Sequence, residues 1–124
     1  MLKMKLLLTF VLLLTSCASL NPPPTDSGIE GQVFVGPMCP VVQEGEECPD
    51  QPYQATLTVT SPKGERIVQI ETDEDGQFRI PLHPGEYVLH PESPDAFPFA
   101  NELTVIVEAG MFTQVIVNYD SGIR

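Results

Sequence analysis

The residues of this sequence that could do covalent chemistry are three cysteines, Cys17, Cys39 and Cys48. A cysteine thiolate is nucleophilic enough to be acylated, can pair into a disulfide, and can ligate a metal ion. Three cysteines in an exported chain would leave one of them outside any internal disulfide. The chemistry of each cysteine therefore depends on the segment that carries it.

Residues 1–16 have the pattern of a signal peptide. They open with Lys3 and Lys5 and continue with an apolar run over residues 6–14. This run is far shorter than the ~20 residues that a membrane-spanning helix needs. Two processing routes remain open, because an ordinary signal peptidase would leave a chain that starts at Ser19, whereas a second route would retain the cysteine.

The second route is supported by the sequence Leu14-Thr15-Ser16-Cys17, which resembles the lipobox of bacterial lipoproteins. The resemblance implies that the thiol of Cys17 receives a diacylglycerol and becomes the new N-terminus. Several acyl chains on one residue give stable attachment to a membrane. Ala18 is not the aspartate that retains lipoproteins at the inner membrane, so the resemblance implies a cell-envelope location, at the outer membrane if the host is Gram-negative.

Acylation of Cys17 would leave Cys39 and Cys48 as a pair, and an oxidising compartment would allow them to form a disulfide. The closed loop of about ten residues would stabilise the fold by roughly 2.5–3 kcal/mol in the chain-entropy model. A metal site of two thiolates is the alternative. It is disfavoured, because the loop contains no histidine and the sequence has no pair of C-x-x-C motifs.

The charge balance excludes one class of partner. Residues 17–124 contain all 17 acidic residues and only four basic ones, which gives a net charge of −13. A nucleic-acid-binding protein needs a concentrated basic surface, so we expect no nucleic-acid partner. The same charge would repel the folded part from anionic lipid headgroups.

Acidic clusters raise the possibility of a calcium or metal site. A full calcium loop needs a later acidic ligand at fixed spacing, and the sequence "TDEDG" passes directly into a strand. We therefore interpret it as a hairpin turn and expect neither a metal nor a cofactor. The acids concerned are Asp73, Glu74 and Asp75 in this turn, and Glu44, Glu46, Glu47 and Asp50 in and beside the disulfide loop.

The sequence shows no catalytic constellation. His83 and His90 are seven residues apart at the two ends of one expected strand, so alternation directs them to opposite faces. No nucleophile-elbow, zinc-protease or phosphate-loop motif is present. We therefore expect a protein without enzymatic activity.

The elements that must position these residues are short strands between turns. Residues 17–28 form a proline-rich tether, residues 29–120 a single domain, and residues 121–124 a tail that is expected to fray. Alternating apolar and polar residues predict seven strands and an all-β, immunoglobulin-like antiparallel sandwich. The expected strands are 29–35, 53–60, 65–71, 77–82, 86–91, 102–108 and 111–119.

Specific motifs support this fold. Their residues are Thr72-Asp73-x-x-Gly76-x-Phe78, Leu82-x-Pro84-Gly85-x-Tyr87-x-Leu89, Val105-x-Val107 and Ala109-Gly110. They resemble the carboxypeptidase regulatory-like group, which implies a transthyretin-like sandwich over residues 29–119, shared with collagen-adhesin B repeats, and no particular activity. The disulfide loop is an insertion relative to this pattern. The first strand lacks a lysine, so we expect no isopeptide bond to Asn118.

Two loops form the candidate binding surface. Phe97 and Phe99 alternate with a proline in the expected crossover loop, and they would make an apolar docking patch if exposed; alternatively, they cover the end of the sandwich. The disulfide loop adds Glu44, Glu46 and Glu47. We expect a monomeric, non-enzymatic lipoprotein that is a binding or structural module, or else an accessory or inhibitor protein that engages an envelope enzyme or polymer through these loops.

Overall fold

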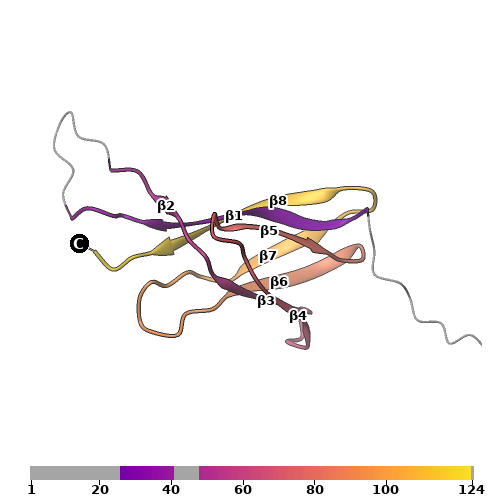
Figure 1. Cartoon of the computed structure of the whole chain (residues 1–124). Helices are drawn as coiled ribbons and strands as arrows, with labels where there is room; N and C mark the ends of the chain where they lie inside the picture. Colours follow the sequence, from indigo (N-terminus) through magenta and orange to yellow (C-terminus); the bar gives the residue numbers. More distant parts are fainter. Residues whose placement is uncertain (1–25, 41–47, 124) are drawn as a thin grey trace, which may run out of the picture.

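The computed structural model describes residues 26–40 and 48–123, which form strands and loops without a helix. Figure 1 shows two layers of strands packed face to face. No helix long and apolar enough to cross a membrane occurs in the described part. The strands are β1 (Gly28–Gly36), β2 (Gln51–Pro52), β3 (Thr56–Thr60), β4 (Arg66–Glu71), β5 (Gln77–Pro81), β6 (Gly85–Pro91), β7 (Leu103–Val107) and β8 (Phe112–Asp120).

The first sheet is built around β1. On one side, β1 pairs antiparallel with β5 and β2; on the other side it pairs parallel with β8, from Gly28 opposite Phe112 to Gly36 opposite Asp120. The expectation of a purely antiparallel sandwich is therefore wrong for this sheet. The chain crosses from the second sheet to reach β8, so no hairpin forces the first and last strands to run in opposite directions.

Close approach of β1 and β8 requires a glycine. A Cβ built at Gly31 would collide with the carbonyl oxygen of Val115 on β8. Glycine at this position lets the two backbones approach each other where a side chain would separate them.

The second sheet is antiparallel, with strand order β4-β3-β6-β7. The β3–β4 pair contains an irregularity between Val59 and Thr60, where the register shifts. The sheet therefore has two edge strands, β4 and β7, and the latter lies next to β8 of the first sheet at one corner of the sandwich.

The structure has one strand more than the sequence predicted. A strand was expected over residues 53–60, but Gln51 and Pro52 pair with β1 as β2, and the second sheet begins only at Thr56. The chain changes from one sheet to the other between these points. Alternation of apolar residues continues through the change, because both sheets direct side chains into the same core, and so the break is invisible in the pattern.

The core lies between the two sheets. Alternation predicts which side chain of each strand faces inward, and most of these are buried, whereas Tyr53 and Tyr87 are half-buried. Alternation along residues 53–60 predicts that Thr58 and Thr60 face solvent, but both are buried on the outer side of β3. The buried residues that were expected to face inward are Ile29, Val33, Val35, Ala55, Leu57, Val59, Phe78, Ile80 and Leu89.

The loops of interest gather at one end of the sandwich. Figure 1 shows the chain that follows β1, the loop between β6 and β7 and the C-terminal end on the left, whereas β1 begins on the right. A strand of nine residues is about 30 Å long. The chain therefore enters the domain at the end opposite these loops.

Candidate functional site: the loop end of the sandwich

The predicted site residues are only partly within the described part of the chain. Cys17 and the three acids Glu44, Glu46 and Glu47 lie outside it, as do the expected signal peptide and most of the tether. Cys39, Cys48, Phe97 and Phe99 are described, and they all lie at the loop end.

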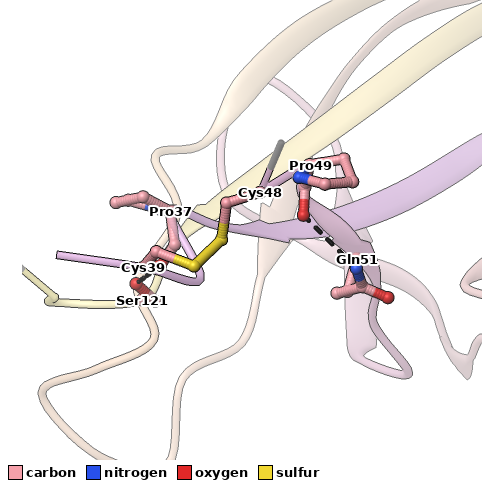
Figure 2. Close-up of a disulfide and its surroundings, with 6 residues drawn as sticks. All are labelled: Pro37, Cys39, Cys48, Pro49, Gln51 and Ser121. Atoms are coloured by element: carbon pink, nitrogen blue, oxygen red, sulfur yellow. Dashed lines mark hydrogen bonds between the residues drawn. A yellow bond between two sulfur atoms is a disulfide. The ribbon is translucent and has the colours of Figure 1, made fainter. Parts of the chain in front are cut away.

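The disulfide between Cys39 and Cys48 is present, as predicted. Cys39 follows the last residue of β1 by three positions, and Cys48 precedes the first residue of β2 by three. The two Cα atoms are 6.2 Å apart. The disulfide therefore closes the loop between two paired strands, and Figure 2 shows it at the point where the two chain segments leave the sheet.

The C-terminal segment binds to the base of this loop. The amide of Ser121 donates a hydrogen bond to the carbonyl of Gly36 (2.9 Å), and its hydroxyl donates one to the carbonyl of Pro37 (2.5 Å). Figure 2 shows Ser121 directly beside Pro37 and Cys39. Residues 121–123 are half-buried. The expectation that this segment frays is wrong, because it has tertiary partners that its own sequence does not reveal.

The loop with the two phenylalanines binds to the same segment. Phe99 and Asp120 form an antiparallel bridge in which each amide donates to the other residue's carbonyl, at 3.0 and 2.7 Å. The ring of Phe97 lies against Gly122, where a Cβ would come within 2.7 Å of it. The C-terminal segment thus joins the Phe97–Phe99 loop to the disulfide loop.

The resulting surface, here called the tip, consists of Pro37–Cys39, Phe97–Phe99 and Ser121–Ile123. It exposes three large apolar side chains: Met38 at 40% and both Phe97 and Phe99 at 48% of their area. The phenylalanines therefore only partly cover the sandwich end. They retain enough exposed area to contact a partner.

A buried tyrosine supports the tip from below. The hydroxyl of Tyr119 donates a hydrogen bond to the carbonyl of Glu92 (2.7 Å), at the start of the phenylalanine-bearing loop. Its ring packs against Tyr53, with centroids 4.9 Å apart. Burial raises the pKa of Tyr119 strongly, and nearby Tyr53 and Glu92 raise it further. The neutral phenol therefore holds the loop on β8.

A polar cleft of about 640 Å³ lies beside the tip, on the outer face of the second sheet, and Phe99 is part of its lining. Within it, the Thr60 hydroxyl lies 2.9 Å from Nε2 of His90, and Nδ1 of His90 lies 3.2 Å from Glu102. The hydroxyl of Thr58 donates to Glu92 (2.8 Å). These contacts explain why Thr58 and Thr60 are buried although they lie on the outer face of the sheet.

The sequence did not predict that these three groups would meet. A hydroxyl, an imidazole and a carboxylate in one hydrogen-bonded chain are the groups of a nucleophilic site. Thr60, however, is only 8% exposed, so its hydroxyl offers little access to a substrate. The contact depends on the register of β3 against β6, which places His90 opposite Thr58, and no motif in the sequence indicates this register.

The other polar clusters are structural where they are described. One carboxylate oxygen of Asp73 accepts hydrogen bonds from the amides of Asp75 (2.9 Å) and Gln77 (2.8 Å), and Gly76 adopts a positive φ of 74°. The predicted turn is therefore present, but the expectation of a hairpin is wrong, because the turn connects β4 of the second sheet to β5 of the first and these two strands do not pair. Over residues 26–40 and 48–123, no group of three histidine, cysteine or acidic side chains is placed to hold a metal ion.

No protein-family model matches the sequence, and no curated protein matches it either. Among solved structures, the chain is similar to the Bacillus anthracis TIE protein, with 22% identical residues and a TM-score of 0.49. The alignment covers 77% of this chain and 17% of that one. This chain therefore spans only about a sixth of the length of the protein that it resembles.

Proposed function

We propose that this protein is a lipid-anchored, non-enzymatic lipoprotein of the bacterial cell envelope and that its β-sandwich is a binding or structural module. The lipobox-like sequence that ends at Cys17 supports the lipid anchor. Ala18 after it supports the outer membrane as the location in a Gram-negative host. The two-sheet, all-β architecture is compatible with the transthyretin-like, carboxypeptidase regulatory-like class that the motifs around Gly76 and Gly85 suggest.

The observation that carries the binding role is the exposed apolar tip. Its aromatic residues Phe97 and Phe99 are held by hydrogen bonds and packing to the C-terminal segment, and that segment is held by the base of the disulfide loop. A surface that is ordered before binding loses little conformational entropy on association. The tip also lies at the end of β1 opposite its first residue, Gly28, at which the chain enters the domain.

A second candidate function is that of an accessory or inhibitor protein that engages an envelope enzyme or polymer. This alternative is favoured by the contact of both predicted loops with residues 120–122. Because they share this support, the disulfide loop and the Phe97–Phe99 loop can present one continuous surface to a single partner.

The anchor is tested by labelling living cells with an alkyne-bearing fatty acid and isolating the protein. We expect label on the wild type and none on the Cys17→Ser variant, whose hydroxyl cannot form the thioether. Mass spectrometry of the native N-terminal peptide provides the second measurement. An unmodified peptide that spans Cys17 would contradict the proposal.

The tip is tested by affinity capture from solubilised envelopes with the wild type and with a Phe97→Ser/Phe99→Ser variant. Ile67→Ser is the matched control, since Ile67 on the β4 edge is 46% exposed and far from these loops in the chain. Loss of one stoichiometric partner from the tip variant alone would support the accessory role. Equal capture by all three proteins would contradict a binding role for the tip.

A further inference from the structure

The outer edge of β8 is a long strand edge without a partner among the described residues. β8 has nine residues and pairs with β1 on one side only. Asp120, at its end, is bridged to Phe99. An unpaired strand edge presents a row of backbone donors and acceptors to any strand that can lie beside it.

Three hydrogen bonds identify which backbone groups of β8 face outward. The carbonyl of Met111 accepts a bond from the amide of Gly28 at the start of β1, so this residue faces β1. Asp120 exchanges two bonds with Phe99, which lies on the other side. Because the backbone groups of successive residues point to alternate sides of a strand, Gln114, Ile116 and Asn118 also present their amides and carbonyls to the open side.

This edge lacks the charges that protect strand edges in soluble proteins. The eight residues from Phe112 to Tyr119 include no charged residue and no proline. By contrast, the edge strand β4 carries Arg66 and Glu71, and the edge strand β5 carries Arg79 and Pro81. The edge strand β7, next to β8, lacks charges and prolines as this part of β8 does. Charged side chains and prolines at edges oppose pairing with another chain.

Exposed apolar side chains accompany the unprotected edge. Ile116 is 55% exposed, Ile106 on β7 is 53% exposed and Met111 is 48% exposed. These three side chains line one groove of about 580 Å³ between β7 and β8. The corner of the sandwich therefore combines open hydrogen-bonding groups with apolar surface.

We propose that β8 pairs with β8 of a second copy of this chain, antiparallel about a two-fold axis at Ile116, in place of the expected monomer. The charge of the edge and of the whole chain indicates which partner can pair with β8. A basic partner would need acids along the edge, and the edge has none, whereas two copies with a net charge of −13 can approach each other only through an uncharged surface.

The register about this axis is self-complementary. Ile116 lies opposite Ile116 of the second copy, and Gln114 lies opposite Asn118, so that uncharged residues meet at each position. The side-chain amide of Gln114 donates to Glu30 of its own β1 (2.7 Å). These three outward-facing residues give three hydrogen-bonded pairs across the axis. Pairing ends before Asp120 because Phe99 already occupies its backbone groups.

Cysteine cross-linking tests this register. The Cα atoms of an antiparallel hydrogen-bonded pair lie about 5.5 Å apart, which is within the range for a disulfide. In the full chain purified from its host, Ile116→Cys is expected to form a disulfide-linked dimer on mild oxidation. Asn118→Cys alone is expected to remain monomeric, and a mixture of Gln114→Cys and Asn118→Cys chains to cross-link. Wild type and Ile67→Cys are the controls.

Sedimentation velocity tests association without added cysteines. We expect a concentration-dependent dimer whose dissociation constant falls with added salt and rises at least tenfold in Ile116→Lys, because two lysines would meet at the axis. Ile67→Lys changes the net charge equally and should leave the constant unchanged. A monomer at all concentrations, equal effects of both lysines, or cross-linking of Ile116→Cys only to a different protein would overturn the proposal. None of these results bears on the tip, which is tested separately.

Discussion

The phenol of Tyr119 shows how one buried residue can make the tip sensitive to pH. Burial raises its pKa above the ordinary value near 10, so the folded state retains the proton at pH values where the unfolded chain releases it. This stabilisation is complete below pH 10 and is lost as the pH rises through the folded-state pKa. We expect the free energy of unfolding to fall steeply above about pH 10 in the wild type.

The Tyr119→Phe variant is the control for this effect, measured by urea denaturation between pH 7 and 11. At pH 7 it should lose about 1 kcal/mol, because the hydrogen bond to Glu92 is removed. Its stability should fall less between pH 9 and 11 than that of the wild type. Parallel pH profiles for the two proteins would show that another group titrates instead.

Gly122 is the second residue on which the tip depends. It has a positive φ of 85°, and its missing side chain leaves room for the ring of Phe97. Gly110 is a matched control, since its φ is 78° and a Cβ there would meet nothing within 4 Å. Gly110→Ala therefore reports backbone strain alone, at about 1–2 kcal/mol.

Gly122→Ala should lower the free energy of unfolding by more than Gly110→Ala does and should also displace the aromatic ring. We expect altered chemical shifts of Phe97 in the first variant and unaltered shifts in the second, measured by NMR. Equal destabilisation with an unmoved ring would mean that Phe97 does not pack as described.

At the scale of elements, the disulfide determines how firmly β2 and the tip are held. Replacing Cys39 and Cys48 by serine should lower the free energy of unfolding by about 2.5–3 kcal/mol, because the unfolded chain regains the entropy of a ten-residue loop. Adding a reductant to the wild type should have the same effect. The reductant should not change the serine variant, and a change there would indicate an unrelated redox effect.

The sequence predicted most elements because a single local pattern specified each of them. Alternation identified Phe78 and Ile80 as core residues of β5, and Asp73 with Gly76 identified the turn before it. The passage of the chain from the first sheet to the second between Pro52 and Thr56 was missed, since both sheets direct their apolar side chains into one core and the alternation continues unbroken. The parallel pairing of β1 with β8 was missed because the relative direction of two strands depends on how the chain connects them, which no local pattern shows.

In the candidate site, too, features with a local signature could be predicted, whereas contacts between residues distant in the sequence could not. The disulfide was predictable by counting cysteines, whereas the sequence placed Phe97 and Phe99 in a loop and left open whether they are exposed or cover the end of the sandwich. The contact of Ser121 with Pro37 joins residues 84 positions apart. The contact of Thr60 with His90 depends on the pairing of β3 with β6. Such contacts have no local signature, so only the folded structure reveals them.

For the whole molecule, the proposed lipid anchor and the proposed pairing through β8 are geometrically compatible. In an antiparallel pair centred on Ile116, the two Phe112 positions are eight residues apart, about 26 Å. Gly28 lies opposite Phe112 in each chain. The proline-rich tether of about 11 residues that the sequence predicts would extend by roughly 30 Å. Both tethers of a pair that lies along the membrane can therefore reach the same surface.

Net charge sets the salt dependence of the fold. The segment from residue 17 onward carries a charge of −13, and in the described part Arg79 forms an ion pair with Glu30. Self-repulsion of the folded state should therefore outweigh attraction at low ionic strength. Raising the salt from about 0.01 M to 0.1 M shortens the screening length from roughly 30 Å to 10 Å and should raise Tm by several degrees.

Calorimetry at low protein concentration measures this effect apart from any dimer. A Glu74→Gln/Glu108→Gln variant removes two exposed acids, and it should start from a higher Tm and gain less from salt. Because this variant and the wild type differ only in charge, a smaller rise of Tm with salt in the variant would identify repulsion as the cause. A Tm that falls with salt would mean instead that attractive pairs such as Arg79–Glu30 dominate the electrostatics of the folded protein.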